Sequence, residues 1–171
     1  MTEGNRHILD DFREAYYWLN QNTEPESKVL AWWDYGYQLA GMSNRTTIID
    51  NNTWNFTHIG LVAKVFTADE QEASKICHNL DADYVLVTFG SYHGFRSDDY
   101  IKFLWFIRIA HDAYPEVNEW EYYKDRKFGL ASDELSDKVA NSLTFKLMYN
   151  RFGEIQLSNE YPAGYDYARD V

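Results

Sequence analysis

Apolar residues recur every three or four positions in several stretches of the chain, and this spacing predicts helices that bury one face. In the first stretch, residues 7–22, the side chains of Ile8, Phe12 and Leu19 would form that face. Further helices are expected at residues 37–42, 58–66, 98–111 and 132–150. Another is expected to open at Thr67-Ala68-Asp69-Glu70, which has the spacing of a capping box, and to run to Asn79.

Short apolar runs between these helices predict strands at residues 28–33, 46–49 and 83–88. The last run contains Val85-Leu86-Val87, and because it is apolar throughout we expect it to be the central strand, buried on both faces. Alternating strands and helices predict an α/β fold, with a small, mainly parallel sheet and surrounding helices in one helix-rich domain, residues 1–171. Residues 112–131 show no firm period and predict a loop or a hairpin.

The first strand leads into Trp32-Trp33-Asp34-Tyr35-Gly36. Two indole N–H donors beside a carboxylate acceptor can together bind a hydroxyl group, so Trp32, Trp33 and Asp34 form a candidate binding site. In α/β sheets, sites form beyond the carboxyl ends of the strands, which would bring this segment close to the loop that leads to Asp98-Asp99. The alternative is structural, with the tryptophans packed in the core and Asp34 capping the next helix.

A second candidate lies on the helix that begins near residue 98. Asp99, Lys102 and Phe106 are spaced so that they share one helix face. An acid, a base and an apolar side chain would thus stand together. The alternative is an ordinary ion pair between Asp99 and Lys102 at the helix start, and spacing alone favours this simpler reading.

Composition and charge exclude several classes of function. The formal net charge of −11 over 171 residues argues against nucleic acid as a partner. The single cysteine, Cys77, excludes an internal disulfide and a cysteine-based zinc site, and the five histidines show no metal-ligand spacing. The sequence contains no nucleophile elbow, phosphate-binding loop or dinucleotide fingerprint. The 6 Trp, 14 Tyr and 10 Phe suit a core, and also a surface that binds peptide, sugar or a partner protein.

Three Asn-x-Thr triplets begin at Asn44, Asn51 and Asn55. Such triplets are acceptors of N-linked glycans, although single ones often arise by chance. Their clustering around one loop favours a secreted or endoplasmic-reticulum lumenal setting.

The Trp-Trp-Asp-Tyr-Gly segment resembles the signature of the catalytic subunit of eukaryotic oligosaccharyltransferase, the enzyme of asparagine-linked glycosylation. Other segments are similar to eukaryotic members of this family: residues 8–19 to the helix before the signature, 50–59 to a glycosylated loop, 99–108 to the Asp-x-x-Lys motif helix and 149–154 to the final helix. The resemblance runs from about His7 to Arg169, nearly the whole chain.

This resemblance implies that the chain is the lumenal, C-terminal sequon-recognition domain of a larger protein of the endoplasmic-reticulum membrane. In the family, acidic residues of a preceding multi-spanning segment hold Mn²⁺ or Mg²⁺ and meet the dolichol-linked oligosaccharide. We therefore expect no catalytic residue and no metal ligand in this chain, and no activity from the chain alone. The implied partners are an acceptor polypeptide with Asn-x-Ser/Thr, the lipid-linked donor and other oligosaccharyltransferase subunits.

The resemblance also implies roles for single residues. The residues matching those that bind the +2 Ser or Thr of the acceptor sequon are Trp32, Trp33 and Asp34. Asp99 and Lys102 match the Asp-x-x-Lys motif that lines the same pocket. The apolar Met or Ile of that motif, which touches the threonine methyl, falls at Phe106, and this departure leaves the choice between Phe106 and Ile107 open.

The three asparagines of the Asn-x-Thr triplets match glycosylated positions of the eukaryotic members: Asn44, Asn51 and Asn55. Of these, Asn55 matches a position whose glycan contacts other subunits. Two functions of other classes stay open beside this one. One is a non-enzymatic lectin or peptide-binding module that uses the aromatic surface. The other, a stand-alone hydrolase, lacks a nucleophile and base in the sequence.

Overall fold

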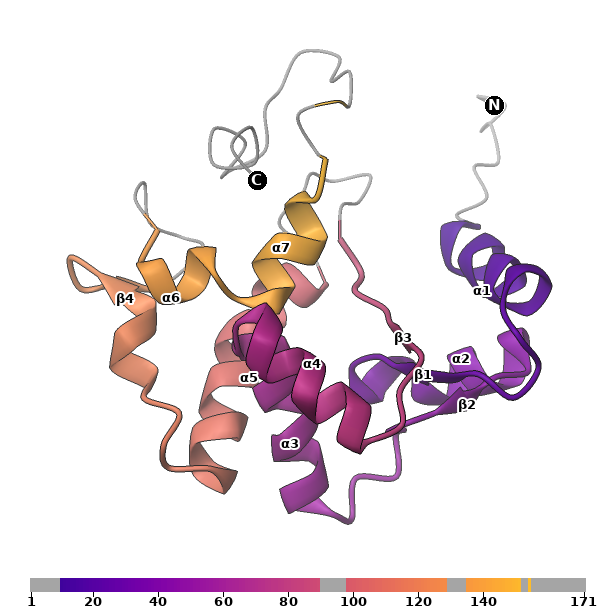
Figure 1. Cartoon of the computed structure of the whole chain (residues 1–171), viewed down its shortest axis with the longest axis horizontal. Helices are drawn as coiled ribbons and strands as arrows, with labels where there is room; N and C mark the ends of the chain where they lie inside the picture. The colour runs from indigo at the N-terminus through magenta and orange to yellow at the C-terminus, as the bar shows by residue number, and fades with distance from the viewer. Residues whose placement is uncertain (1–9, 90–97, 129–134, 152–153, 155–171) are drawn as a thin grey trace, which may run out of the picture.

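The structure is a computed structural model that describes residues 10–89, 98–128, 135–151 and 154 (Figure 1). Its helices are α1 (Asp11–Asn22), α2 (Gly36–Ser43), α3 (Phe56–Thr67), α4 (Glu70–Asn79), α5 (Asp99–Ala113), α6 (Asp137–Ala140) and α7 (Leu143–Tyr149), with 3-10 turns η1 (Trp33–Tyr35) and η2 (Glu119–Tyr122). Its strands are β1 (Lys28–Leu30), β2 (Thr46–Thr47), β3 (Tyr84–Val85), β4 (Tyr123–Lys124) and β5 (Lys127–Phe128).

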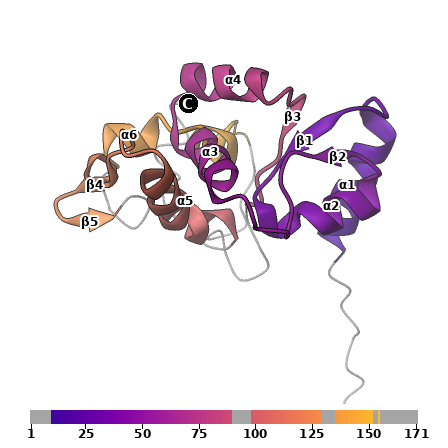
Figure 2. The ribbon, with the colours of Figure 1, turned by 90° about the horizontal axis from the view of Figure 1, so that it is seen from below.

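The first three strands form a parallel sheet in the order β2-β1-β3. Lys28 pairs with Thr46 on one side of β1, and Leu30 pairs with Val85 on the other. The helices α1 and α2 lie with this sheet at one end of the molecule, and the hairpin β4–β5 lies with α6 at the opposite end (Figure 2). A small parallel sheet with surrounding helices confirms the predicted fold class.

Alternate residues of the β1 segment enter two separate cores. Val29 and Ala31 join Tyr16 and Leu39 in a small core with α1 and α2. Leu30 and Trp32 belong to the larger core, which is built mainly from α3, α5 and α7. Because neighbouring side chains of a strand point to opposite faces, this segment has helices on both of its faces.

The expectation that residues 83–88 form the central strand is wrong. β1 is central, with Val29 and Leu30 fully buried, whereas β3 lies at the edge and Val85 is only half-buried. Both segments are apolar, so their order in the sheet depends on the helix connections rather than on composition. The strands are also shorter than predicted, since β1 gives way to a 3-10 turn at Trp33.

The proposed capping box also proves wrong, although α4 lies where it was expected. Asp69, and not Thr67, is the N-cap residue, and its side chain accepts a hydrogen bond from the amide of Glu72. The Thr67 hydroxyl instead donates to the carbonyl oxygens of Ala63 and Lys64 in the last turn of α3. Thr67 thus closes one helix and does not open the next.

The single helix expected over residues 132–150 is divided into α6 and α7. Ser142 separates them, and its side chain caps α7 by accepting from the amide of Phe145. The amide of Leu143 bonds to the carbonyl oxygen of Ala68, 2.8 Å away, so a contact outside the helix replaces a helical one.

The other expected helices and the hairpin are confirmed within the described residues, with bounds that shift by a few positions. The expected beginnings of the first and last helices, residues 7–9 and 132–134, lie outside them, as does most of the loop after Phe89. None of the described helices has the length and apolar composition of a membrane-spanning segment.

Gly36 and Gly41 give a matched test of this packing. A Cβ at Gly36 would lie 2.4 Å from the Cα of Asp50 and 2.6 Å from the carbonyl oxygen of Ile49, whereas one at Gly41 would meet nothing within 4 Å. We expect Gly36→Ala to lower the free energy of unfolding by about 2–3 kcal/mol, because backbone atoms must move. Gly41→Ala should raise it by about 0.5–1 kcal/mol. Denaturant unfolding measures both, and equal effects would contradict the close contact.

Candidate functional site

The candidate segment forms a tight turn at the carboxyl end of β1. Trp32 is extended and precedes η1, and the amide of Tyr35 donates to the carbonyl oxygen of Trp32 over 3.1 Å. Trp32 is 3% exposed, whereas Trp33 and Asp34 are half-buried. The structural alternative therefore holds for Trp32, which packs in the core. The other two side chains remain partly accessible to a ligand.

Lys102 on α5 connects that helix to the turn. Its Nζ lies 2.6 Å from Asp34 Oδ2 and donates to Tyr35 Oη over 2.7 Å. The same Nζ lies 4.2 Å from the centre of the Tyr35 ring, a cation–π distance. Lys102 thus forms its ion pair across the fold with Asp34, and Asp34 serves in this pair and not as the cap of α2. The expected proximity of the two segments is confirmed.

Phe106 lies one helical turn further along the same face of α5. Its ring centre is 4.5 Å from that of Trp32 and 5.1 Å from that of Phe66. Both Phe106 and Ile107 are fully buried. The shared face predicted for α5 thus does meet the turn, but Phe106 reaches it from inside the core, as a support for the Trp32 ring. Neither Phe106 nor Ile107 is available at the surface for a threonine methyl.

Asp99 is fully buried at the start of α5 and connects it to the segment after β3. Its Oδ2 accepts from the amide of Thr88 over 2.7 Å, and its own amide donates to the Thr88 carbonyl oxygen. Burial raises the pKa of Asp99 to about 7. The Thr88 amide and Lys102 oppose this rise, while the charges of Asp34 and Asp98 add to it.

The loop after β2 supports the turn from the other side. Asn51 donates through Nδ2 to the carbonyl oxygen of Asp34 and accepts through Oδ1 from the amide of Tyr37, each over 3.1 Å. Sequence reasoning assigned Asn51 only to glycosylation, and it missed this role and that of Tyr35. The one available signal was the ability of Asn side chains to bond backbone groups in turns.

The other glycosylation candidates, Asn44 and Asn55, are exposed, whereas Asn51 is half-buried. Asn44 ends α2 in a left-handed conformation with φ of 52°. Asn55 caps α3 by accepting from the amide of His58.

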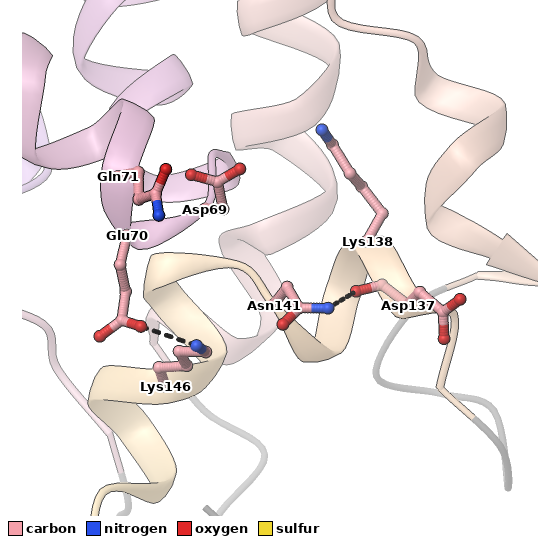
Figure 3. A pocket seen from close by; sticks show the side chains of 7 residues that line it. All are labelled: Asp69, Glu70, Gln71, Asp137, Lys138, Asn141 and Lys146. Carbon is pink, nitrogen blue, oxygen red and sulfur yellow. Dashed lines mark hydrogen bonds and ion pairs between the residues drawn. The ribbon is translucent and has the colours of Figure 1, made fainter.

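A hollow of about 480 Å³ lies away from the turn, between the start of α4 and the helices α6 and α7 (Figure 3). Polar side chains line it, and several pair with one another: Lys146 bonds Glu70 over 2.7 Å, and Asn141 bonds the carbonyl oxygen of Asp137. None of the sequence-predicted site residues lines this hollow.

The described residues bring together no group of three or more His, Cys, Asp or Glu side chains that could hold a metal ion. The divalent metal implied by the family resemblance therefore finds no ligand set in this part of the chain.

Comparison with known proteins connects this site to a family. Residues 25–103, from just before β1 into α5, match the STT3/PglB/AglB core domain. Over 170 residues the chain is 49% identical to the dolichyl-diphosphooligosaccharide–protein glycosyltransferase subunit STT3B of Arabidopsis thaliana, covering 99% of this chain and 23% of that subunit. Over nearly its whole length the chain is similar to a member of the STT3/PglB/AglB family. It spans about a quarter of the length of this relative.

Two solved structures share the fold of this chain. The C-terminal globular domain of an oligosaccharyltransferase from Archaeoglobus fulgidus has a TM-score of 0.59 at 24% identity, covering 90% of this chain and 94% of that one. Another oligosaccharyltransferase of that organism, tethered to an acceptor peptide containing the NVT sequon, has a TM-score of 0.58 at 17% identity, covering 95% of this chain and 25% of that one. The α/β architecture is thus that of a known C-terminal domain.

The role of Asn51 can be tested against a control from its own triplet. Asn51→Ala removes both hydrogen bonds to the turn, and we expect it to lower the free energy of unfolding by about 1–2 kcal/mol. Thr53→Ala removes the same Asn-x-Thr triplet but keeps the Asn51 amide, and it should cost less than about 0.5 kcal/mol because Thr53 is exposed. Equal losses in urea unfolding would assign the effect to the triplet and not to the amide.

The raised pKa of Asp99 predicts a pH dependence of stability. Ionising this carboxyl is more costly in the folded chain than in the unfolded one, so its contribution to stability should fall as the pH rises from about 4 to about 7, by an amount on the order of 4 kcal/mol. Asp99→Asn should remove this part of the pH dependence, while Asp112→Asn, at an exposed position of the same helix, should keep it. Parallel stability curves for the Asp99→Asn variant and the wild type would refute the shift.

Proposed function

We propose that this chain is the acceptor-recognition part of an oligosaccharyltransferase catalytic subunit. In this proposal the turn at Trp33 and Asp34 binds the +2 Ser or Thr hydroxyl of an Asn-x-Ser/Thr acceptor. The observation that carries it is the position of Asp34, a half-buried carboxylate held by Lys102 beside a partly accessible tryptophan. The similarity to a glycosyltransferase subunit of Arabidopsis and the acceptor peptide tethered in the Archaeoglobus enzyme support the same assignment.

The chemistry of a hydroxyl fits this arrangement, because a hydroxyl both donates and accepts a hydrogen bond. The indole N–H of Trp33 would donate to the hydroxyl oxygen, and the carboxylate of Asp34 would accept the hydroxyl proton. Asp34 Oδ1 is buried, which leaves Oδ2, the oxygen that bonds Lys102, as the one that a ligand can reach. Lys102 then has two tasks, since it fixes the orientation of this carboxylate and offsets its charge.

Trp32 and Phe106 support the site from the side of the larger core. The Trp32 ring lies against Phe106, and Phe106 lies against Phe66 in the core of α3 and α5. This stack of rings gives the turn a rigid base, and rigid support is what a polar site needs to hold its donors in place. In this proposal Trp33 and Asp34 make the contacts to the acceptor and Trp32 keeps them aligned.

The rest of the reaction is assigned to the parts of the relatives that this chain does not span. We place the dolichol-linked oligosaccharide, the divalent metal and the catalytic residues there, in an enzyme of the endoplasmic-reticulum membrane with this domain on the lumenal side. The other partners are the acceptor polypeptide and further oligosaccharyltransferase subunits. The asparagines proposed to carry glycans are Asn44, Asn51 and Asn55.

Trp33→Ala in the complete enzyme tests the assignment. We expect kcat/KM for an Asn-x-Thr peptide to fall at least about 100-fold, because the hydroxyl loses its donor and the site loses its shape. The preference for Thr over Ala at the +2 position should fall with it. Trp120→Ala, at a side chain that is 75% exposed and outside the turn, is the matched control and should behave like the wild type. A Trp33→Ala enzyme with a wild-type preference for Thr over Ala would refute the proposal.

A further inference from the structure

Three buried side-chain oxygens in the described part of the chain have no hydrogen-bond partner: Tyr16 Oη, Asp34 Oδ1 and Asp99 Oδ1. They come from three separate elements, α1, η1 and α5. Tyr16 is 1% exposed and Asp99 is fully buried. Buried polar atoms in folded proteins almost always have partners, so each exception needs an explanation.

The three oxygens lie in one region of the molecule. The Phe12 ring centre is 6.2 Å from that of Tyr16 and 5.8 Å from that of Tyr35. The Tyr35 hydroxyl bonds both Lys102, the partner of Asp34, and Asp98, the neighbour of Asp99. Burial raises the pKa of Tyr16 to about 12, and the nearby charges of Asp34 and Asp99 add to the rise. The Tyr16 hydroxyl therefore keeps its proton at neutral pH, within electrostatic reach of both carboxyl groups. One hydroxyl proton cannot satisfy two acceptor oxygens, and no direct bond joins Tyr16 to either of them.

A single water molecule meets the needs of all three atoms. It would accept the hydrogen bond from the Tyr16 hydroxyl and donate one hydrogen to each carboxylate. Three hydrogen bonds are the usual number for a buried water in a protein.

We propose that Tyr16 is a positioning residue of the acceptor site, whose hydroxyl holds Asp34 and Asp99 through one bound water. The inference rests on the proposed function, in which Asp34 accepts the acceptor hydroxyl. Asp34 is then fixed at both oxygens, with Oδ2 on Lys102 and Oδ1 on the water. A carboxylate with both oxygens fixed cannot rotate, so it is oriented before the acceptor arrives.

The Tyr16 ring itself is held by packing, which makes the hydroxyl separable from it. The ring belongs to the small core with Leu19, Val29 and Leu39, and its centre is 6.2 Å from that of Phe12. Tyr16→Phe should therefore keep the packing and remove one oxygen.

Tyr122→Phe supplies the matched control. Tyr122 is also 1% exposed, but its hydroxyl donates to the carbonyl oxygen of Thr67 over 3.0 Å, in the larger core. Both variants lose one buried hydroxyl, and only Tyr16→Phe loses it beside the acceptor turn.

Both variants are tested in the complete enzyme, with peptides that carry Thr or Ala at the +2 position. We expect Tyr16→Phe to raise the KM for the Thr peptide roughly tenfold and to reduce the preference for Thr over Ala, with a smaller change in kcat. Tyr122→Phe should lower the melting temperature and leave KM unchanged. A crystal structure of the wild type should show a water within hydrogen-bonding distance of all three oxygens.

The outcomes separate this inference from the proposed function. If Trp33→Ala abolishes the preference for Thr and Tyr16→Phe leaves KM and that preference unchanged, the role of Tyr16 is overturned and the proposed function stands. If neither variant changes the preference for Thr, the proposed function is refuted, and the role of Tyr16 is refuted with it. Should Tyr16→Phe not fold, the crystal structure decides: a direct contact among the three side chains, with no water between them, overturns the inference.

Discussion

The burial of β1 on both faces is the constraint on which the rest of this structure depends. Val29 and Ala31 lie in one core and Leu30 and Trp32 in the other, so the strand can neither shift its register nor turn over without exposing apolar side chains to water. The chain leaves this strand directly into the turn at Trp33 and Asp34. The position of the candidate site is therefore fixed by packing on both sides of the sheet, before any polar contact is made.

The polar contacts then offset the negative charge of the aspartates beside the turn. The ammonium group of Lys102 pairs with Asp34 and lowers the pKa of Asp99, while the charges of Asp34 and Asp98 add to the rise that burial gives the pKa of Asp99. Lys102 bonds the carboxylate oxygen of Asp34 that a ligand can reach, while the raised pKa of Asp99 leaves this second carboxyl group partly protonated near neutral pH, so that it carries less charge. The carboxylate proposed to accept the acceptor hydroxyl thus keeps its cationic partner, while burial disfavours the charged form of its neighbour Asp99.

Much of this architecture could be predicted from local patterns. The helical period placed α1, α3 and α5, and the spacing of Asp99, Lys102 and Phe106 placed one face of α5 against the turn. The order of the strands could not be predicted, since β1 and β3 are both apolar and differ only in which helices cover them. Thr67 and Asp69 are both good cap residues, and only the bond from Thr67 back into α3 decides between them. Tyr16 lies on an apolar face of α1, where the sequence pattern predicts only that an aromatic ring is a core residue. The role inferred for its hydroxyl depends on two carboxylates that are distant in sequence and near in space.

The amide of Asn51 has a consequence for the modification of this loop. Its Nδ2 uses one hydrogen in the bond to the Asp34 carbonyl oxygen, and an asparagine amide has two. A sugar joined to this nitrogen replaces one hydrogen and leaves the other, which is enough for that single bond. The same side chain can therefore carry a glycan toward solvent and still hold the backbone of the turn.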